Sequence, residues 1–164
     1  MEISEKELED LIFETDNEYL NERGLNIYGK KKRQISTFKH GILDLLTYRR
    51  YKDDFNNNYL EINIIELKKD QIDINTLNQI IRYARGVQDF MQGRGNYNYF
   101  ITLTLIGNSV NLSNDIFAYL PILINSYSIS CTCIFSIEYY IYRLKWDGIY
   151  FENININSLE NKIY

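Results

Sequence analysis

The sequence predicts a single α/β domain, spanning residues 1–164, in which a central mixed sheet is flanked by helices. Segments with apolar residues at helical spacing alternate along the chain with segments rich in β-branched residues, which indicates both helices and strands. Several strands follow one another as a meander and later strands come singly between helices, an order typical of an α/β sandwich. A chain of 164 residues is long enough to bury one ordinary hydrophobic core.

The first expected helix covers residues 4–22. Ser4 can cap its start, because Glu7 follows three residues later in the pattern of a capping box. Apolar residues from Leu8 onward recur at helical spacing. Gly24 is the residue type that most often follows the end of a helix, so the helix is expected to stop before it.

A meander of strands is expected next, because apolar and β-branched residues are frequent in this region. Its first two strands are separated by a basic turn at 29–32, and its last two form a hairpin around a polar, charged turn at 49–58. The expected strands are residues 25–29, 33–38, 41–48 and 59–69.

The second half of the chain is expected to alternate helices with strands. Asp73 or Asn75 can cap the second helix, and Gly93 or Gly95 can end it. The elements expected after it are a strand at 97–106, a helix at 114–125, a strand at 129–144, and a short strand at 149–151 that follows a turn at Gly148.

Composition is typical of a soluble protein of the cytoplasm. Cys131 and Cys133 lie two residues apart in a strand-like run, where a disulfide would be strained, so reduced core cysteines are expected. With one histidine in the chain, no zinc site can be assembled. The first residues are polar and acidic, unlike a secretory signal. Polar residues and a proline interrupt the uncharged stretch 116–137, so we interpret it as a buried helix and strand and not as a membrane span.

Two apolar strands carry charged residues that can meet. Side chains alternate along a strand, so Glu66 and Lys68 share one face while Leu67 points to the other. Hairpin pairing can place Asp44 beside Glu66. Two adjacent carboxylates repel each other unless a cation is bound, and oxygen ligands favour Mg²⁺ or Mn²⁺, with the Leu67 backbone carbonyl as a further ligand. The simpler alternative is surface ion pairing among these side chains.

Phosphodiester cleavage would give these residues a purpose, because it requires an activated water and stabilised charge on the phosphate. Lys68 can position that water beside a metal and offset negative charge. Gln79 and Tyr83 are four residues apart, hence on one helical face, and can hydrogen-bond a phosphate or the water. A plain pair at the solvent edge is the alternative for these two residues.

Together, the patterns Gly41-x-x-Asp44, Glu66-x-Lys68 and Gln79-x-x-x-Tyr83 resemble those of the PD-(D/E)xK nuclease superfamily. The resemblance is in particular to the catalytic domain of NucS-type (EndoMS) endonucleases and their RecB-like relatives, and it covers roughly residues 4–107. Glu5-x-x-Leu8-Glu9 is similar to the first helix of that group, which carries a metal-facing glutamate. We favour Glu9 for that role, with Glu5 as the alternative.

The resemblance implies a restriction-endonuclease-like α/β/α sandwich and a Mg²⁺-dependent (or Mn²⁺-dependent) deoxyribonuclease, an endonuclease, that hydrolyses DNA with a metal-activated water. Two departures are visible: Leu43 stands where the superfamily has its proline, and the hairpin turn is long. The implied metal ligands are Glu9, Asp44, Glu66 and the Leu67 carbonyl. The implied catalytic set is Asp44, Glu66 and Lys68, supported by Gln79 and Tyr83.

The expected partner is DNA, as a branched, flap or duplex substrate, and a homodimer is plausible for so small a domain. A net charge of −4 argues against coating of nucleic acid by bulk electrostatics, so local basic residues must hold the backbone phosphates. A solvated charged face is the alternative for the run at 30–33. The residues expected to contact DNA are Lys30, Lys31, Lys32, Arg33, Arg49, Arg50, Lys69, Arg82 and Arg85.

Two other functions stay open. The chain could be a non-catalytic nucleic-acid-binding or assembly module that keeps the fold, although such a module has no reason to retain costly charges in apolar strands. It could also be an RNA-directed nuclease. The bias toward Ile, Asn and Tyr suits an AT-rich genome, as in a phage or mobile element.

Overall fold

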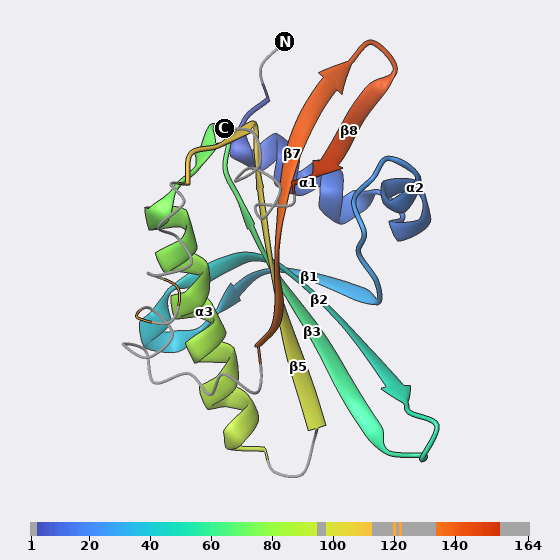
Figure 1. Cartoon of the computed structure of the whole chain (residues 1–164), viewed down its shortest axis with the longest axis vertical. Coiled ribbons are helices and arrows are strands. Elements are labelled where there is room, and N and C mark those ends of the chain that lie inside the picture. Colours follow the sequence, from blue (N-terminus) through green and yellow to red (C-terminus); the bar gives the residue numbers. More distant parts are fainter. Residues whose placement is uncertain (1–2, 95–97, 113–119, 121, 123–133, 155–164) are drawn as a thin grey trace, which may run out of the picture.

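The computed structural model describes residues 3–94, 98–112, 120, 122 and 134–154. Within them, a six-stranded sheet with the order β1-β2-β3-β5-β7-β8 forms the centre of the molecule, and β4 pairs with β6 separately (Figure 1). The elements are α1 (Glu5–Glu14), α2 (Asn17–Glu22), β1 (Lys30–Ser36), the short 3₁₀ helix η1 (Phe38–His40), β2 (Ile42–Lys52), β3 (Asn58–Leu67), β4 (Gln71–Ile72), α3 (Ile74–Gln92), β5 (Asn98–Gly107), β6 (Ser109–Val110), β7 (Ile134–Lys145) and β8 (Gly148–Asn153).

The central sheet is mixed. β1, β2 and β3 pair antiparallel, β3, β5 and β7 are parallel neighbours, and β8 returns antiparallel beside β7. α3 packs on one face of the sheet, whereas α1 and α2 lie against the other (Figure 1). The predicted α/β class, with a central mixed sheet flanked by helices, is confirmed.

Two hydrophobic cores hold the sheet between its helices. Ile64 of β3 packs in the core that includes Ile80 of α3, and Ile65 packs in the core that includes Leu8 of α1. Neighbouring residues enter different cores because successive side chains of a strand point to opposite faces. Burial of each such side chain stabilises the fold by roughly 1.5–3 kcal/mol. β3 is therefore fixed on both faces, and so is the position of its carboxyl end.

The single helix predicted over residues 4–22 is wrong in one respect, because the chain forms two helices. The predicted capping box at Ser4 is present. α1 ends at Glu14, its C-cap Thr15 has an extended backbone, and Asp16 precedes α2. The break is stabilised from outside, because the ammonium of Lys31 donates hydrogen bonds to the backbone carbonyls of Ile12 and Thr15. These carbonyls would otherwise lack partners at the helix end.

The basic run lies in a strand and not in a turn. β1 begins at Lys30, and the predicted strand at 25–29 is not formed. The strand predicted at 33–38 starts earlier and gives way to η1. Because β1 is an edge strand of the six-stranded sheet, Lys30 and Lys32 can keep their charges in solvent, whereas Lys31 turns to the end of α1.

The hairpin of β2 and β3 is longer than predicted. Pairing continues along both strands, so the turn covers residues 53–57 rather than 49–58. The polar residues assigned to the turn belong to strands because they satisfy one another across the ladder, as Arg49 does by its ion pair with Glu61. The rings of Tyr51 and Tyr59, which face each other across the same two strands, are stacked with centroids 5.5 Å apart.

Several other predictions are confirmed. Asp73 caps α3 through the Thr76 backbone N–H, and Gly93 ends the helix. β5 and β8 lie where strands were predicted. The short strands β4 and β6 were not predicted, since two residues give no periodicity. The predicted helix at 114–125 (apart from Leu120 and Ile122), the start of the strand at 129–144, and both cysteines lie outside the described residues.

None of the helices in the described part of the chain is both long enough and apolar enough to cross a membrane.

Candidate active site

Asp44 and Glu66 meet where the pairing of β2 and β3 ends. The antiparallel register runs as far as Leu45 opposite Ile65, so Asp44 and Glu66 occupy the next position. There the Asp44 carboxylate replaces the strand partner: its Oδ2 accepts a hydrogen bond of 3.0 Å from the Leu67 backbone N–H. The predicted proximity of the two carboxylates is confirmed, and the Asp44 carboxylate lies at the carboxyl end of β3.

Glu66 is a buried carboxylate with incomplete hydrogen bonding. The residue is 1% exposed. Its Oε1 accepts a hydrogen bond of 2.8 Å from Lys68 Nζ, whereas its Oε2 has no hydrogen-bond partner. Burial, and after it the charge of Asp44, raises the pKa of the Glu66 carboxyl from 4.5 to about 7. Near neutral pH this carboxyl therefore holds a proton part of the time.

Burial and nearby charges also shift the pKa values of the two neighbours of Glu66, Asp44 and Lys68. Burial raises the pKa of the Asp44 carboxyl above its ordinary value, although the Leu67 N–H and the Lys68 ammonium act in the opposite direction. Burial lowers the pKa of Lys68, but its hydrogen bond to Glu66 and the surrounding carboxylates outweigh this effect, and the net change is upward. Lys68 is thus a firmly held cation between two carboxyl groups that burial makes less acidic.

Helix α1 brings two further carboxylates to the same place. Glu9 is 5% exposed, its Oε2 accepts a 2.8 Å hydrogen bond from Gln34, and its Oε1 forms no hydrogen bond but lies 3.5 Å from the Lys6 ammonium in an ion pair. Glu5 accepts a 3.2 Å hydrogen bond from the backbone N–H of Lys69. The charges of both glutamates raise the pKa of Asp44. Of the two glutamates, only Glu5 also raises the pKa of Glu66. The two sequence candidates on this helix are therefore both at the site.

The donors at this site match a hard divalent cation in kind. Glu66 presents a buried oxygen without a hydrogen-bond partner, and such atoms are rare unless an ion, water or ligand completes them. The corresponding oxygen of Glu9 also lacks a hydrogen bond, and the Lys6 ammonium lies 3.5 Å from it. The Leu67 carbonyl belongs to the same side of β3 as its N–H, toward Asp44. Across the described ranges, no three carboxylate, histidine or cysteine side chains are yet close enough to hold a metal. The side chains would therefore have to converge on binding it.

Gln79 and Tyr83 form a pair on α3, as their spacing predicted. Gln79 Nε2 donates a hydrogen bond of 2.8 Å to the Tyr83 hydroxyl. Tyr83 is buried, and its ring lies 3.0 Å from the position that a Cβ on Gly41 would occupy. Gly41 has a φ of +107°, a conformation that favours glycine. Within the described ranges neither side chain hydrogen-bonds to the Asp44–Glu66 pair or to Lys68, and Tyr83 contacts the loop before Asp44 by packing beside Gly41.

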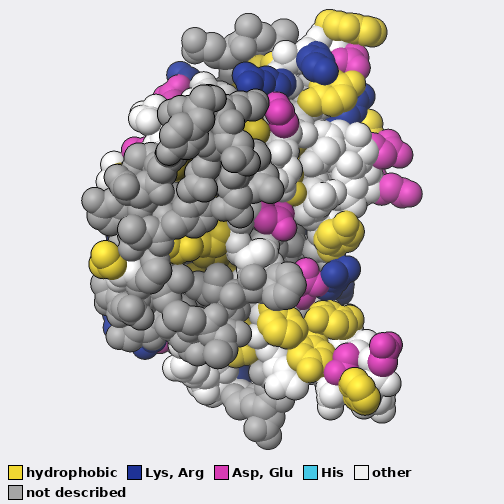
Figure 2. Space-filling view, in the orientation of Figure 1, with side chains coloured by type: hydrophobic (Ala, Val, Ile, Leu, Met, Phe, Trp, Pro, Cys, Tyr) yellow, Lys and Arg dark blue, Asp and Glu magenta, His cyan; other side chains and the backbone are white. Residues whose placement is uncertain are grey.

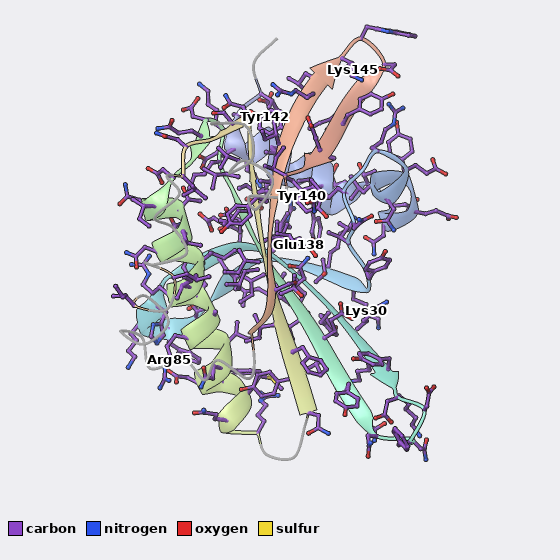
Figure 3. All side chains as sticks on the ribbon, viewed as in Figure 1. Lys30, Arg85, Glu138, Tyr140, Tyr142 and Lys145 are labelled. Carbon is purple, nitrogen blue, oxygen red and sulfur yellow. The ribbon has the colours of Figure 1, made fainter. Side chains whose placement is uncertain are left out.

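The basic residues expected to contact DNA do not form one patch. Lys30 and Arg85 lie on opposite sides of the molecule (Figure 3). Several of the others have partners within the protein. Lys31 caps the end of α1, Arg33 forms a 2.6 Å ion pair with Asp10, Arg49 pairs with Glu61, Arg82 lies over the Tyr83 ring, Arg85 forms a 2.9 Å ion pair with Asp89, and the Lys69 backbone binds Glu5.

A groove collects two of the predicted cations and one that the sequence analysis missed. It has a volume of about 490 Å³ and lies on the sheet face that α3 covers. Lys32, Arg50 and Arg94 line it together with the exposed rings of Phe38 and Phe90, and among the described residues no carboxylate does. The signal that could have found Arg94 is its place at the end of the predicted second helix.

Comparison with known proteins gives one structural likeness. No family model matches the sequence, and no curated protein matches it. Among solved structures, the fold is similar to the crystal structure of a repair endonuclease from Pyrococcus abyssi, with 22% sequence identity and a TM-score of 0.44. The match covers 84% of this chain and 46% of that one, so this chain spans about half the length of the endonuclease.

Proposed function

We propose that this protein is a metal-dependent deoxyribonuclease of the PD-(D/E)xK type, with a restriction-endonuclease-like fold. The observation that supports this most is Glu66: a carboxylate at 1% exposure, with one free oxygen, beside Asp44 and bonded to Lys68. Burying such a group lowers the stability of the folded protein. Nothing in the packing of β3 needs a carboxylate at this position, so a function that uses its charge is the better explanation.

Mg²⁺ or Mn²⁺ would be held by Asp44, Glu66 and the Leu67 carbonyl, with Glu9 or Glu5 completing the set. When bound, the metal would lower the pKa of a water and polarise a phosphate oxygen. The chain itself would supply the rest. Lys68, fixed by its 2.8 Å hydrogen bond to Glu66, would orient the attacking water and offset the charge on the phosphate.

DNA would run from the carboxyl end of β3, where Glu66 lies, toward the groove beside Leu60 and Ile62 near the amino end of the strand. Lys32, Arg50 and Arg94 line a groove to which no carboxylate of the described part of the chain contributes. Phosphate contacts of this kind fix the position of the backbone without reading sequence. The packing of Tyr83 against Gly41 would keep the loop before Asp44 in place.

The test is cleavage of duplex, single-stranded and branched DNA, with an RNA control, in Mg²⁺ or Mn²⁺. Wild type is compared with Glu66→Gln and Lys68→Met, and with Glu61→Gln as a control on the same strand. We expect the first two variants to remain folded and to lose activity by about a hundredfold or more, while the control cuts normally. A folded wild type that cuts no substrate with either metal would overturn the proposal, and preferred cleavage of RNA would change the substrate.

A second function, a non-catalytic binding module on the same fold, is favoured by one observation. The carboxylates of the described residues are not gathered into a ready metal site. Isothermal calorimetry with Mn²⁺ separates the two functions, because a nuclease should show a saturable site that Asp44→Asn abolishes. A binding module should show no such site while still binding DNA.

A further inference from the structure

The hairpin of β7 and β8 carries the most exposed aromatic side chain of the described residues at its tip. Trp146, in the two-residue turn between Lys145 and Gly148, is 98% exposed. Tryptophan is among the residues most buried on average, because its large apolar surface is costly in water. It is also the single tryptophan of the chain. Its complete exposure is not explained by the packing of the fold.

The tip is held rigidly although Trp146 itself is free. Asp147 accepts a hydrogen bond of 2.5 Å from the Tyr150 hydroxyl and forms a 3.4 Å ion pair with Arg23. The guanidinium of Arg23 lies 4.5 Å from the centre of the Tyr150 ring, and the Lys145 ammonium lies 4.3 Å from it. These contacts fix both sides of the turn. Trp146 is therefore presented to solvent from a fixed support.

The same hairpin is tied to the candidate active site at its base. The Tyr142 hydroxyl donates a hydrogen bond of 2.6 Å to the backbone carbonyl of Lys69, the residue after Lys68. The strand registers place Glu66 level with Leu105 and Leu105 level with Tyr139, so Trp146 lies seven residues, about 23 Å, further along the hairpin than the level of Glu66. Because successive base pairs of B-DNA are about 3.4 Å apart, this reach corresponds to roughly seven base pairs. Figure 3 shows Tyr142 and Lys145 along this hairpin, with Lys145 toward its tip.

Charge near the tip suits a nucleic-acid backbone. Arg143 and Lys145 are both exposed and are two residues apart on one strand, hence on one face of it. Hydrophobic side chains at the end of the hairpin stand beside Lys and Arg side chains (Figure 2). The one carboxylate of the turn, Asp147, is occupied by Tyr150 and Arg23.

We propose that Trp146 stacks on a base of the DNA substrate, roughly seven base pairs from the cleaved bond, while Arg143 and Lys145 contact the adjacent phosphates. This inference rests on the proposed nuclease function for its substrate. Stacking of an aromatic ring on a base stabilises the complex whichever base it is. The base can be unpaired, or the ring can insert between two stacked base pairs. The hairpin then acts as a fixed arm that sets the distance between the contacted base and the site at Glu66.

The full chain provides its own probe, because Trp146 is the single tryptophan. Its fluorescence is titrated in EDTA with a duplex and with a single-stranded oligonucleotide, and saturation is measured separately by the anisotropy of labelled DNA. We expect quenching that follows the binding curve. Trp146→Ala should bind about tenfold more weakly, and Trp146→Phe should recover most of that loss. Phe55→Ala is the matched control, since Phe55 is 87% exposed at the tip of the other hairpin.

Each outcome has a defined meaning. Unchanged fluorescence at saturating DNA, or equal affinities of the Trp146→Ala and Phe55→Ala variants, would overturn the stacking proposal even if the wild type cuts DNA. Quenching without cleavage in any metal would leave the stacking contact in place and overturn the nuclease. A fall in sedimenting mass of Trp146→Ala in the absence of DNA would identify the tip as a contact between copies of the chain and overturn the proposal.

Discussion

Replacing Glu66 with glutamine is expected to stabilise the metal-free protein, and to do so more at high pH than at low pH. Glu66 is 1% exposed, and burial followed by the charge of Asp44 raises the pKa of its carboxyl from 4.5 to about 7. Glutamine has the same shape and no charge. Its amide oxygen can still accept the hydrogen bond that Lys68 donates to Glu66.

The sign and the size of the effect follow from proton linkage. The folded protein holds the Glu66 proton more tightly than the unfolded chain does, so stability is lost as pH rises from 4.5 toward 7, and the whole loss is present above pH 7. The interval between these two pKa values corresponds to roughly 3 kcal/mol at pH 8 and to about 1 kcal/mol at pH 5. Glu66→Gln should recover these amounts.

Urea denaturation followed by circular dichroism, at pH 5 and pH 8 with EDTA present, measures the difference directly. Glu152→Gln, on the exposed side of β8, is the control for removal of a carboxylate without burial. A variant less stable than wild type at pH 8 would refute the reasoning. So would an equal gain at both pH values, because burial of the ionised form would then not be the cause.

Two further predictions concern the supports of the fold. Lys31→Met should lower the free energy of unfolding by about 1–3 kcal/mol, because the carbonyls of Ile12 and Thr15 lose their hydrogen-bond donor. The affinity for DNA should stay as in wild type. Urea denaturation measures the stability, and anisotropy titration with labelled DNA measures the affinity. Asp73→Ala should cost about 1 kcal/mol at pH 7 by removing the cap of α3. The Thr76 backbone N–H lowers the pKa of Asp73, so this difference should persist above pH 3.8 and shrink as pH falls through the folded pKa, which denaturation at pH 7 and pH 3 would reveal.

The parts of the fold that were predictable are those set by local chemistry. The caps at Ser4 and Asp73 follow from side chains that reach their own helix, so the sequence is sufficient to place them. The meeting of Asp44 and Glu66 was also predictable, because alternation along a strand and pairing across a hairpin fix which residues share a face. Because this meeting depends on one pairing register, the prediction of the β2–β3 hairpin was the step that placed the candidate site.

The parts that were not predictable depend on partners distant in sequence. Arg49 was assigned to a turn for its polarity, but it lies in a strand because Glu61 faces it across the ladder. Lys31 was grouped with a DNA-binding run, yet strand alternation directs it to the end of α1. The choice between Glu5 and Glu9 could not be made either, because it depends on how α1 rotates against the sheet.

The position of Asp44 explains why the candidate site lies where two strands separate. The last rung of the β2–β3 ladder is closed by its side chain and not by backbone, since Oδ2 accepts the Leu67 N–H. One carboxylate oxygen therefore takes the place of a backbone acceptor, and the charge of the same carboxylate acts on Glu66. A structural feature that satisfies the backbone thus also places two carboxylates side by side, at the expense of a raised pKa in both. An amide at position 44 could close the same rung without that electrostatic cost, so the closing of the ladder does not by itself require the charge that this residue carries.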